Sequence, residues 1–465
     1  MLKASLYSVQ IDRYDQEEAL KNNPNDVFNK VGPGTAMGEV FRRFWLPALL
    51  SEQAVERDGS PVRLRILGED LLAFRDSNGK VGVIGAYCRH RLAPLYFGRN
   101  EECGLRCIYH GWKWNADGDC VDIPNIPQAA NVEQLKEKAR ITSYPTFEGG
   151  GIVWVYMGPE GKQPPVPNFE WLNLPEDHVY VASWIHHSNW HLPMEGEIDT
   201  SHISFLHSSK PNADSPTAGL LQMASDGAPE ITLRETDYGY VYGSRRKFGD
   251  EFYWRVTQWM LPMWSAIPGA TEFFAGNGRG WVPVDDRTTM AYCYMYNPDR
   301  PLTPEEVQFA KSGAIFPPRT EYRPVELHDG YVVDAYDTVA NKKNDYLIDR
   351  EVQKTQNYSG IWGISEQDRA LIESMAWAGP DQPGMVDTTQ EMLVTSDMSI
   401  MTARRILAKL ASDLEKGIEP AAAQSGDVGV RAISIVSPIA DFDELMEKHG
   451  DLGKAQATRK AEATA

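Results

Sequence analysis

Two cysteines and two histidines between residues 88 and 110 constrain this chain more than any other feature. Cys88-x-His90 is followed by sixteen residues and then by Cys107-x2-His110. Thiolates and imidazoles in two short loops can hold either one tetrahedral zinc ion or an iron–sulfur cluster. Zinc fingers usually take a Cys pair from one element and a His pair from the other, whereas each loop here supplies one of each. The pattern therefore favours a [2Fe–2S] centre with two thiolates on one iron and two imidazoles on the other. Structural zinc is the alternative.

The residues around this pattern alternate in hydropathy as β-strands do. Val62, Leu64 and Ile66 are apolar at every second position, and the turn signal Asp-Ser-Asn-Gly follows at 76–79. Alternation interrupted by Asn-Gly is typical of antiparallel hairpins. We therefore expect residues 45–162 to form a small all-β domain.

The length of 465 residues predicts more than one domain, and the Pro-rich stretch 163–167 is a plausible boundary. Residues 1–44 are expected to form an N-terminal helical arm, with a short helical run over 41–50. From residue 163 to 465, strand-like runs precede helical ones, which predicts an α+β domain with an antiparallel sheet. Residues 450–465 are expected to be disordered. The strand-like runs lie at 230–233, 238–242, 252–260 and 288–296, and the helical runs at 304–312, 366–376 and 397–415.

Composition excludes several kinds of partner. The formal net charge is −19, whereas proteins that bind nucleic acid need a basic surface. The chain has no run of about 18 apolar residues that could span a membrane, and it begins without an export signal. We therefore expect a soluble cytoplasmic protein that binds neither nucleic acid nor membrane.

A second set of metal-ligand residues lies at 189–207. Glu195, Asp199 and His202 are spaced i, i+4 and i+7, so that a continuous helix would place them on one face. His202 and His207 are five residues apart, about 140° around a helix, and can reach one ion only if the helix is distorted or ends between them. Two imidazoles and one carboxylate form the facial triad that holds Fe(II) in oxygenases. Asp368, at the start of an expected helix, is the predicted third ligand, with Glu373 as a weaker candidate.

Together these stretches resemble the Rieske non-haem iron ring-hydroxylating oxygenases, whose motifs are C-x-H…C-x2-H and N-W-x4-E-G-x2-D-x2-H-x4-H. The resemblance covers nearly the whole chain and is strongest to the phthalate-dioxygenase-like branch. It implies that the second domain has a START-like helix-grip fold and that His202, His207 and Asp368 bind iron. It also marks Asn189 as catalytic and makes Asp199 a bridge between an iron-ligand His and His110 of a neighbouring subunit. Further matching stretches are 31–50, 107–125, 245–262 and 368–375.

The function implied by this resemblance is that of a terminal oxygenase component. Electrons from NAD(P)H would arrive through a separate reductase that carries flavin and [2Fe–2S]. The oxygenase would form homotrimers or stacked trimers, with one Rieske [2Fe–2S] cluster and one mononuclear Fe(II) per subunit. The expected substrate is a small aromatic compound. Because aromatic carboxylates are the usual substrates of this branch, a carboxylate is expected, and the reaction would be a dihydroxylation, a monooxygenation or a demethylation. Two alternatives are a monooxygenase of a small non-aromatic substrate such as a branched alcohol, and a START-like binding protein with structural zinc.

The roles of four further residues stay open at this point. His191 lies close to the second motif and could line the cavity or compete as a ligand. Arg245, Arg246 and Arg255 could bind a substrate carboxylate in a bidentate way, or they could form structural salt bridges.

Overall fold

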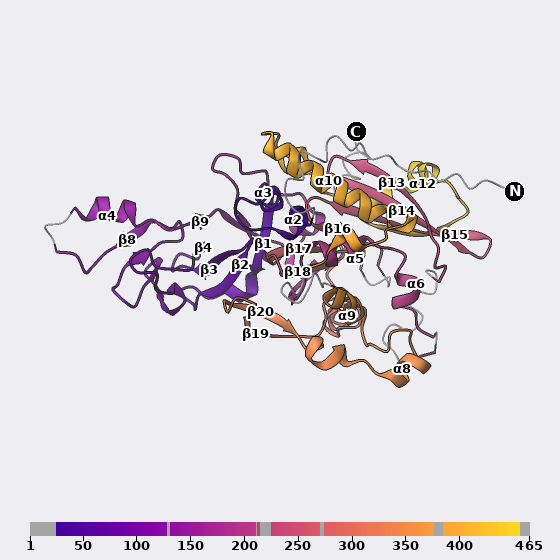
Figure 1. Ribbon diagram of the computed structural model, residues 1–465, viewed down its shortest axis with the longest axis horizontal. Coiled ribbons are helices and arrows are strands. Elements are labelled where there is room, and N and C mark those ends of the chain that lie inside the picture. Colours follow the sequence, from indigo (N-terminus) through magenta and orange to yellow (C-terminus); the bar gives the residue numbers. More distant parts are fainter. Residues whose placement is uncertain are drawn as a thin grey trace.

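The computed structural model describes residues 25–127, 131–210, 212–213, 225–269, 274–375 and 385–455. Within these ranges the chain forms a smaller all-β half and a larger half in which helices accompany one extended antiparallel sheet, which confirms the α+β prediction (Figure 1). No helix in the described part of the chain is both long and apolar enough to cross a bilayer.

Three small antiparallel sheets build the first half. Hairpins connect most neighbouring strands, as the alternation around residues 62–85 predicts, but β4 pairs with β9 and β1 with β11. The sheets have the strand orders β2-β3-β4-β9, β5-β6-β7-β8 and β1-β11-β10. Their strands are β1 (Trp45–Leu50), β2 (Val62–Ile66), β3 (Glu69–Arg75), β4 (Val81–Gly85), β5 (Arg99–Glu101), β6 (Gly104–Arg106), β7 (Lys113–Trp114), β8 (Cys120–Asp122), β9 (Ser143–Tyr144), β10 (Thr146–Gly149) and β11 (Ile152–Tyr156).

The helical run expected over 41–50 is wrong. Helix α3 (Ala36–Phe41) ends before it, and Trp45–Leu50 forms β1, which pairs with β11. All six residues of β1 are buried, so the segment lacks the polar face by which sequence distinguishes a strand from a helix. Pro47 has no backbone N–H to donate to a helix or a sheet. It lies where the pairing of β1 with β11 is irregular, between residues 47 and 49.

The larger half is organised by an eight-stranded antiparallel sheet. Its strand order is β12-β18-β17-β16-β15-β14-β13, and β21 also pairs with β15. Three of the predicted strand runs, 230–233, 252–260 and 288–296, lie in β13, β15 and β18, while 238–242 lies almost wholly in β14. The strands are β12 (Val179–His186), β13 (Glu230–Thr236), β14 (Gly239–Phe248), β15 (Glu251–Met260), β16 (Trp264–Ala266), β17 (Gly276–Asp285), β18 (Thr288–Tyr296) and β21 (Ile433–Ser437).

Helices cover this sheet and position the residues of interest. The longest, α10, lies across β13 and β14 (Figure 1) and also contacts α3 of the N-terminal segment. The helices are α2 (Asp26–Asn29), α3, α4 (Val132–Lys138), α5 (His191–Ile198), α6 (Ile203–Leu206), α7 (Pro304–Lys311), α8 (Arg350–Thr355), α9 (Ile364–Met375), α10 (Met398–Glu415), α11 (Ala421–Ser425) and α12 (Phe442–His449).

The disorder expected for residues 450–465 is wrong for residues 450–455, which are ordered. A 3₁₀ turn at Gly450–Gly453 is followed by backbone hydrogen bonds from Arg431 N to Gly453 O and from Ala455 N to Gly429 O. These bonds hold the segment against residues 429–431. Residues 456–465, and residues 1–24 of the expected N-terminal arm, lie outside the described ranges.

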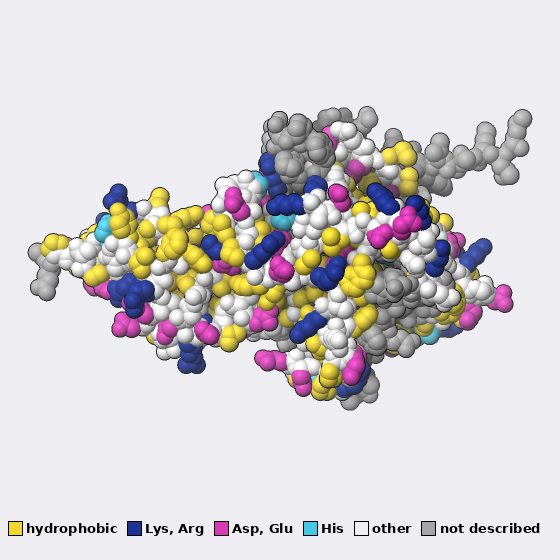
Figure 2. All heavy atoms as spheres, turned by 90° about the horizontal axis from the view of Figure 1, so that it is seen from below, with side chains coloured by type: hydrophobic (Ala, Val, Ile, Leu, Met, Phe, Trp, Pro, Cys, Tyr) yellow, Lys and Arg dark blue, Asp and Glu magenta, His cyan; other side chains and the backbone are white. Residues whose placement is uncertain are grey.

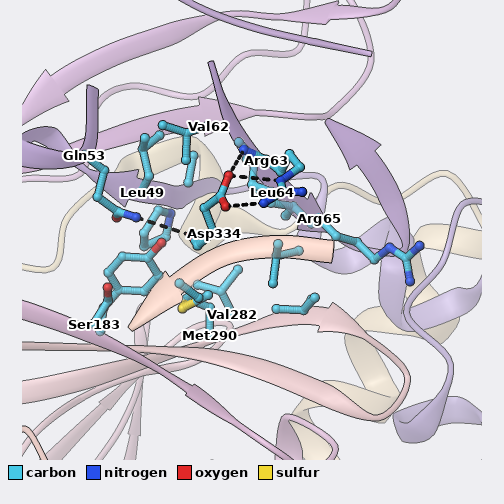
Figure 3. A pocket seen from close by; sticks show the side chains of 17 residues that line it. Leu49, Gln53, Val62, Arg63, Leu64, Arg65, Ser183, Val282, Met290 and Asp334 are labelled. Atoms are coloured by element: carbon cyan, nitrogen blue, oxygen red, sulfur yellow. Dashed lines mark hydrogen bonds and ion pairs between the residues drawn. The ribbon is translucent and has the colours of Figure 1, made fainter. Parts of the chain in front are cut away.

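A hairpin joins the two halves. Strands β19 (Thr320–Glu326) and β20 (Val332–Thr338) pair with each other, and β20 contacts both β2 and β12. Figure 3 shows Asp334 of β20 facing Arg63 of β2: the carboxylate accepts hydrogen bonds from the Arg63 backbone N at 2.9 Å and from Nη2 at 2.6 Å. Both side chains are mostly buried, so this pair is a main polar attachment between the halves.

We expect Asp334→Ala to lower the free energy of unfolding by about 2 kcal/mol, because the Arg63 guanidinium would stay buried without its partner. The matched control is Asp329→Ala, which removes a carboxylate of the same hairpin that is half exposed where it pairs with Arg65. Exposed pairs contribute about 0–1 kcal/mol. Urea unfolding followed by tryptophan fluorescence measures both. Equal losses in the two variants would contradict this account of the interface.

Candidate metal centres and active-site cavity

The segment from residue 189 to 207 does not form one continuous helix. Helix α5 ends at Ile198, and Asp199 has an extended backbone (φ −78°, ψ 116°). Its Oδ1 accepts hydrogen bonds from Ser201 N at 2.7 Å and Ser201 Oγ at 2.8 Å, a local turn typical of aspartate. The short helix α6 follows, flanked by His202 and His207. One break thus precedes His202, and α6 itself ends at Leu206, between the two histidines, as their spacing requires.

The early end of α5 overturns the prediction that Glu195, Asp199 and His202 share one helical face. Glu195 accepts two hydrogen bonds from Arg404 of α10, each 2.7 Å long. Asp199 has a different partner, because its Oδ2 lies 3.3 Å from His202 Nδ1. Glu195 is therefore part of the packing between α5 and α10, whereas Asp199 contacts the side chain that sequence proposes as a ligand.

His202, His207 and Asp368, here called the triad, converge on one point. His207 Nε2 lies 3.1 Å from His202 Nε2 and 3.1 Å from Asp368 Oδ1, and His202 Nε2 lies 3.6 Å from the same oxygen. Helix α9 begins at Ile364, two residues before the predicted start at residue 366. Asp368 therefore lies in the second turn of the helix. Two imidazole nitrogens and a carboxylate on one side of a point are the donors that suit a divalent iron.

Local electrostatics keep two carboxylates ionised, that of Asp368 in the triad and that of Asp199 beside it. Burial would raise the pKa of Asp199, but hydrogen bonds from His202 and Ser201 lower it to about 2. Burial likewise opposes ionisation of Asp368, and the neighbouring His207 and His202 lower its pKa below the ordinary value. Both acids are therefore anions at neutral pH, as a ligand and a hydrogen-bond acceptor must be.

Glu373, the weaker candidate for the third ligand, has other partners. Its Oε1 accepts hydrogen bonds from Arg369, and its Oε2 accepts one of 2.6 Å from the Tyr346 hydroxyl. It faces away from the triad into a buried network that fixes α9.

A cavity adjoins the triad. One wall is apolar, made by isoleucines and Phe316. Arg255, Thr257 and Asn277, from β15 and β17, add polar groups. The lining also includes the triad, Asp199 and Arg279, so the apolar wall faces many polar and charged groups. Apolar surface beside converging polar groups is typical of a small-molecule site. The apolar lining residues are Ile203, Ile267, Pro268, Ile315, Phe316 and Ile364.

Two arginines of the cavity differ in how they are neutralised. Arg279 forms an ion pair with Glu197 and lies over the ring of Phe316, 3.3 Å from guanidinium carbon to ring centroid. Arg255 donates to the Tyr253 hydroxyl at 3.3 Å and to the Pro268 carbonyl at 3.0 Å. Within the described residues no carboxylate forms an ion pair with Arg255, although the residue is only 6% exposed. Arg255 is thus a buried cation of the cavity wall whose side-chain hydrogen-bond partners among the described residues are neutral.

The other arginines that sequence analysis left open are structural. Arg245 pairs with Glu230 of the adjacent strand and contacts Phe252 and Trp254. Arg246 donates to Thr200 and Ser244. Neither lines the cavity.

The first set of ligand residues lies at the tips of hairpins in the all-β half. Cys88 and Cys107 are buried, and His90 and His110 lie edge to face with ring centroids 4.5 Å apart. Trp112 stacks on His90 at 4.6 Å. Burial raises the pKa of Cys88 to about 11, so metal binding has to displace its proton. His90 Nδ1 is buried with no hydrogen-bond partner among the described residues, which suits a metal ligand.

The surface beside this centre is apolar. Leu92 is 70% exposed, and Ile108 and Tyr109 are also exposed in the same two loops. Figure 2 shows hydrophobic side chains gathered on the viewed face of this half, with acidic and basic side chains along its edge. The loops that hold the candidate cluster thus present a surface suited to contact with another protein.

Two residues of the second motif are not brought to the cavity. His191 is buried, with Nδ1 3.2 Å from Glu195 Oε1 and Nε2 3.2 Å from Asn29 Oδ1, so it neither lines the cavity nor joins the triad. Asn189 donates to the carbonyls of Asn29 and Asp286 at 3.0 and 2.8 Å. Its contacts tie α2 to the β17–β18 turn, and the residue does not line the cavity, so its catalytic role stays a prediction.

Three residues of the site were missed from sequence. Gln367 contacts His207, and Glu197 and Arg279 form their ion pair at the cavity wall. Gln367 and Arg279 lie outside the metal motifs, and all three acquire their roles through partners distant in sequence. Only the adjacency of Gln367 to Asp368 could have drawn attention to it.

Comparisons with known proteins agree with this geometry. The Rieske [2Fe-2S] domain family matches residues 44–145, and the family described as LigXa C-terminal domain like matches residues 155–464. The oxygenase subunit of 3-chlorobenzoate-3,4-dioxygenase from Comamonas testosteroni is 39% identical, over 87% of this chain and 91% of its own. The phthalate 4,5-dioxygenase oxygenase subunit from Pseudomonas putida is 35% identical, over 93% and 94%.

A solved structure shares the fold. Dicamba monooxygenase bound to 3,6-dichlorosalicylic acid superposes with a TM-score of 0.56 at 16% identity, covering 81% of this chain and 98% of that one. The family matches and the two relatives confirm the resemblance found in the sequence and leave the zinc-containing binding protein without support. The chain therefore belongs to the Rieske non-haem iron oxygenases, in the phthalate-dioxygenase-like branch, as an oxygenase component whose cofactors are a Rieske [2Fe–2S] cluster and a mononuclear iron.

Proposed function

We propose that this oxygenase dihydroxylates the ring of a small aromatic carboxylate. The observation that carries the proposal is Arg255, a buried cation without a carboxylate partner in the described residues, in the same cavity as the triad. The aromatic acids in the names of the two relatives, 3-chlorobenzoate and phthalate, carry the anionic group that such an arginine binds in a bidentate way. Ile267, Ile315 and Phe316 offer an apolar wall for the ring.

In this proposal His202, His207 and Asp368 hold the mononuclear iron, and Cys88, His90, Cys107 and His110 hold the cluster. When bound, the iron supplies dioxygen activation and the cluster supplies single electrons. The protein's own part is to orient the ring beside the triad through Arg255 and to keep the reacting carbon in an apolar, water-poor space. Asp199 holds His202 in one orientation through the contact with Nδ1.

Asp199 is also proposed to connect the two centres across a subunit boundary. In Figure 1 the β5–β8 sheet lies at one end of the molecule, whereas α6 and α9 lie in the other half. Electron transfer slows steeply with distance, which favours a closed homotrimer, alone or stacked, in which His110 of one subunit meets Asp199 of the next. Electrons would come from a separate reductase that carries flavin and [2Fe–2S] and uses NAD(P)H, and the oxygenase itself would be cytoplasmic. The chain would divide into an arm (1–44), a Rieske domain (45–162) and a catalytic domain (163–465).

A substrate screen under ¹⁸O₂ tests the reaction. The purified protein, a generic reductase and NADH are incubated with benzoate, 3-chlorobenzoate, phthalate, benzamide and tert-amyl alcohol. The proposal predicts a cis-dihydrodiol, or the catechol derived from it, carrying two labelled oxygens from at least one aromatic acid. Turnover confined to the alcohol, or products with a single labelled atom, would contradict it.

We expect Arg255→Met to raise KM for the aromatic acid by about 10- to 100-fold, since a hydrogen-bonded charge pair contributes about 1.5–3 kcal/mol. The variant should also lose the preference for the acid over the corresponding amide. Arg245→Met is the matched control, because Arg245 lies on the adjacent strand but pairs with Glu230 outside the cavity. An unchanged acid-to-amide ratio in Arg255→Met would remove Arg255 from the substrate site.

A further inference from the structure

Gln367 forms a close contact with one member of the triad. Its side chain is 1% exposed, and its Oε1 lies 2.7 Å from His207 Nδ1. Gln367 directly precedes Asp368 on α9, so one turn of helix supplies both a proposed iron ligand and the partner of another. Its backbone N donates to Gly363 O at 3.2 Å.

The orientation of the Gln367 amide follows from its other partner. Gln367 Nε2 donates to the Ile361 carbonyl at 3.0 Å, so Oε1 is the atom that faces His207. The same carbonyl accepts a hydrogen bond of 3.1 Å from Asn357 Nδ2, which fixes the acceptor in place. An amide oxygen only accepts, and His207 Nδ1 must therefore carry the proton. Nε2, which points at the rest of the triad, is left with its lone pair.

The two imidazoles of the triad are thus supported differently. Behind His202 stands the carboxylate of Asp199, and behind His207 stands a neutral amide. An acceptor on the far nitrogen fixes the ring plane and tautomer of a metal-bound histidine, and an anionic acceptor also increases its basicity. The difference is built into the fold, because both supporting residues are themselves held by further hydrogen bonds.

We propose that Gln367 is a positioning residue that fixes the tautomer and ring orientation of His207 for metal binding. This inference rests on the proposed ligand set of His202, His207 and Asp368. It goes beyond that set by assigning metal affinity to a residue that touches neither metal nor substrate.

The test compares Gln367→Met, Gln367→Glu and His207→Ala in the full-length protein, with the Rieske cluster retained and the mononuclear site stripped by a chelator. Co(II) is titrated as the probe and its affinity is read from the visible ligand-field bands. Thermal unfolding is measured in parallel. Methionine fills the same volume without an acceptor. Glutamate restores an acceptor for Nδ1–H but sets its second oxygen against the Ile361 carbonyl.

Gln367→Met is expected to bind Co(II) about 10- to 100-fold more weakly than the parent protein. Gln367→Glu is expected to bind Co(II) more tightly than Gln367→Met does. The glutamate variant should nevertheless unfold at a lower temperature than both the parent protein and Gln367→Met. If Gln367 only filled space, affinity would follow stability, and glutamate would be the weaker binder. That order, or Co(II) affinity within about threefold of the parent in Gln367→Met, would overturn the inference. Retention of Co(II) by His207→Ala would instead overturn the proposed ligand set.

Discussion

Asp368→Ala is expected to remove the mononuclear iron and abolish product formation while the Rieske cluster stays intact. The carboxylate supplies the one anionic donor of the triad, 3.1 Å from His207 Nε2 and 3.6 Å from His202 Nε2. Without it, two neutral imidazoles would face the metal from one side. Iron should fall from about three to about two atoms per chain, and the EPR signal of the reduced cluster should be unchanged.

Glu373→Gln is the control for this variant, since it changes another buried carboxylate of the same helix. Glu373 binds Arg369 and Tyr346, so its replacement should reduce stability but leave iron content at about three per chain. If Glu373→Gln lost the iron and Asp368→Ala kept it, the two acids would have to exchange roles.

Asp199→Asn is expected to leave both metals bound and yet lower turnover by at least about 100-fold. Asparagine keeps the size of the side chain and one acceptor oxygen, so His202 should hold its position. It removes the negative charge, however, on which we propose the connection between His202 and His110 of the adjoining subunit depends. Stopped-flow absorbance should show that the reduced cluster is reoxidised far more slowly in the presence of substrate and oxygen.

Ser201→Ala provides the comparison for Asp199→Asn. Ser201 donates to Asp199 Oδ1 through both its backbone N and its hydroxyl, and the variant loses only the second of these bonds. Turnover should fall by less than about tenfold. Wild-type rates of cluster reoxidation in Asp199→Asn would rule out its bridging role.

Local spacing made part of this structure predictable. The ligand pattern at 88–110 lies in two short loops, and hairpin strands alternate visibly around it, so both the centre and its fold class follow from neighbouring residues. His202 and His207 are also close in sequence. Asp368, however, is predictable only in combination with the two metal motifs, because a lone aspartate near a helix start is most often a favourable charge at the helix dipole.

The structure differs from the sequence-based expectations where contacts between distant residues determine the local conformation. Trp45–Leu50 is buried on both faces and therefore has no periodicity, and β11 makes it a strand. Helix α5 ends at Ile198 because Asp199 closes a turn with Ser201, which a regular i, i+4 spacing does not reveal. Gln367 and Arg255 differ from other polar residues only through what surrounds them in the folded protein.

Diffraction from crystals at the iron absorption edge tests the central claim most directly. Anomalous difference maps should show iron at two places in each chain. One peak is expected between the Cys88, His90, Cys107 and His110 side chains, and the other among His202 Nε2, His207 Nε2 and the Asp368 carboxylate. No iron peak at the second place, or a zinc-edge peak at the first, would contradict the account.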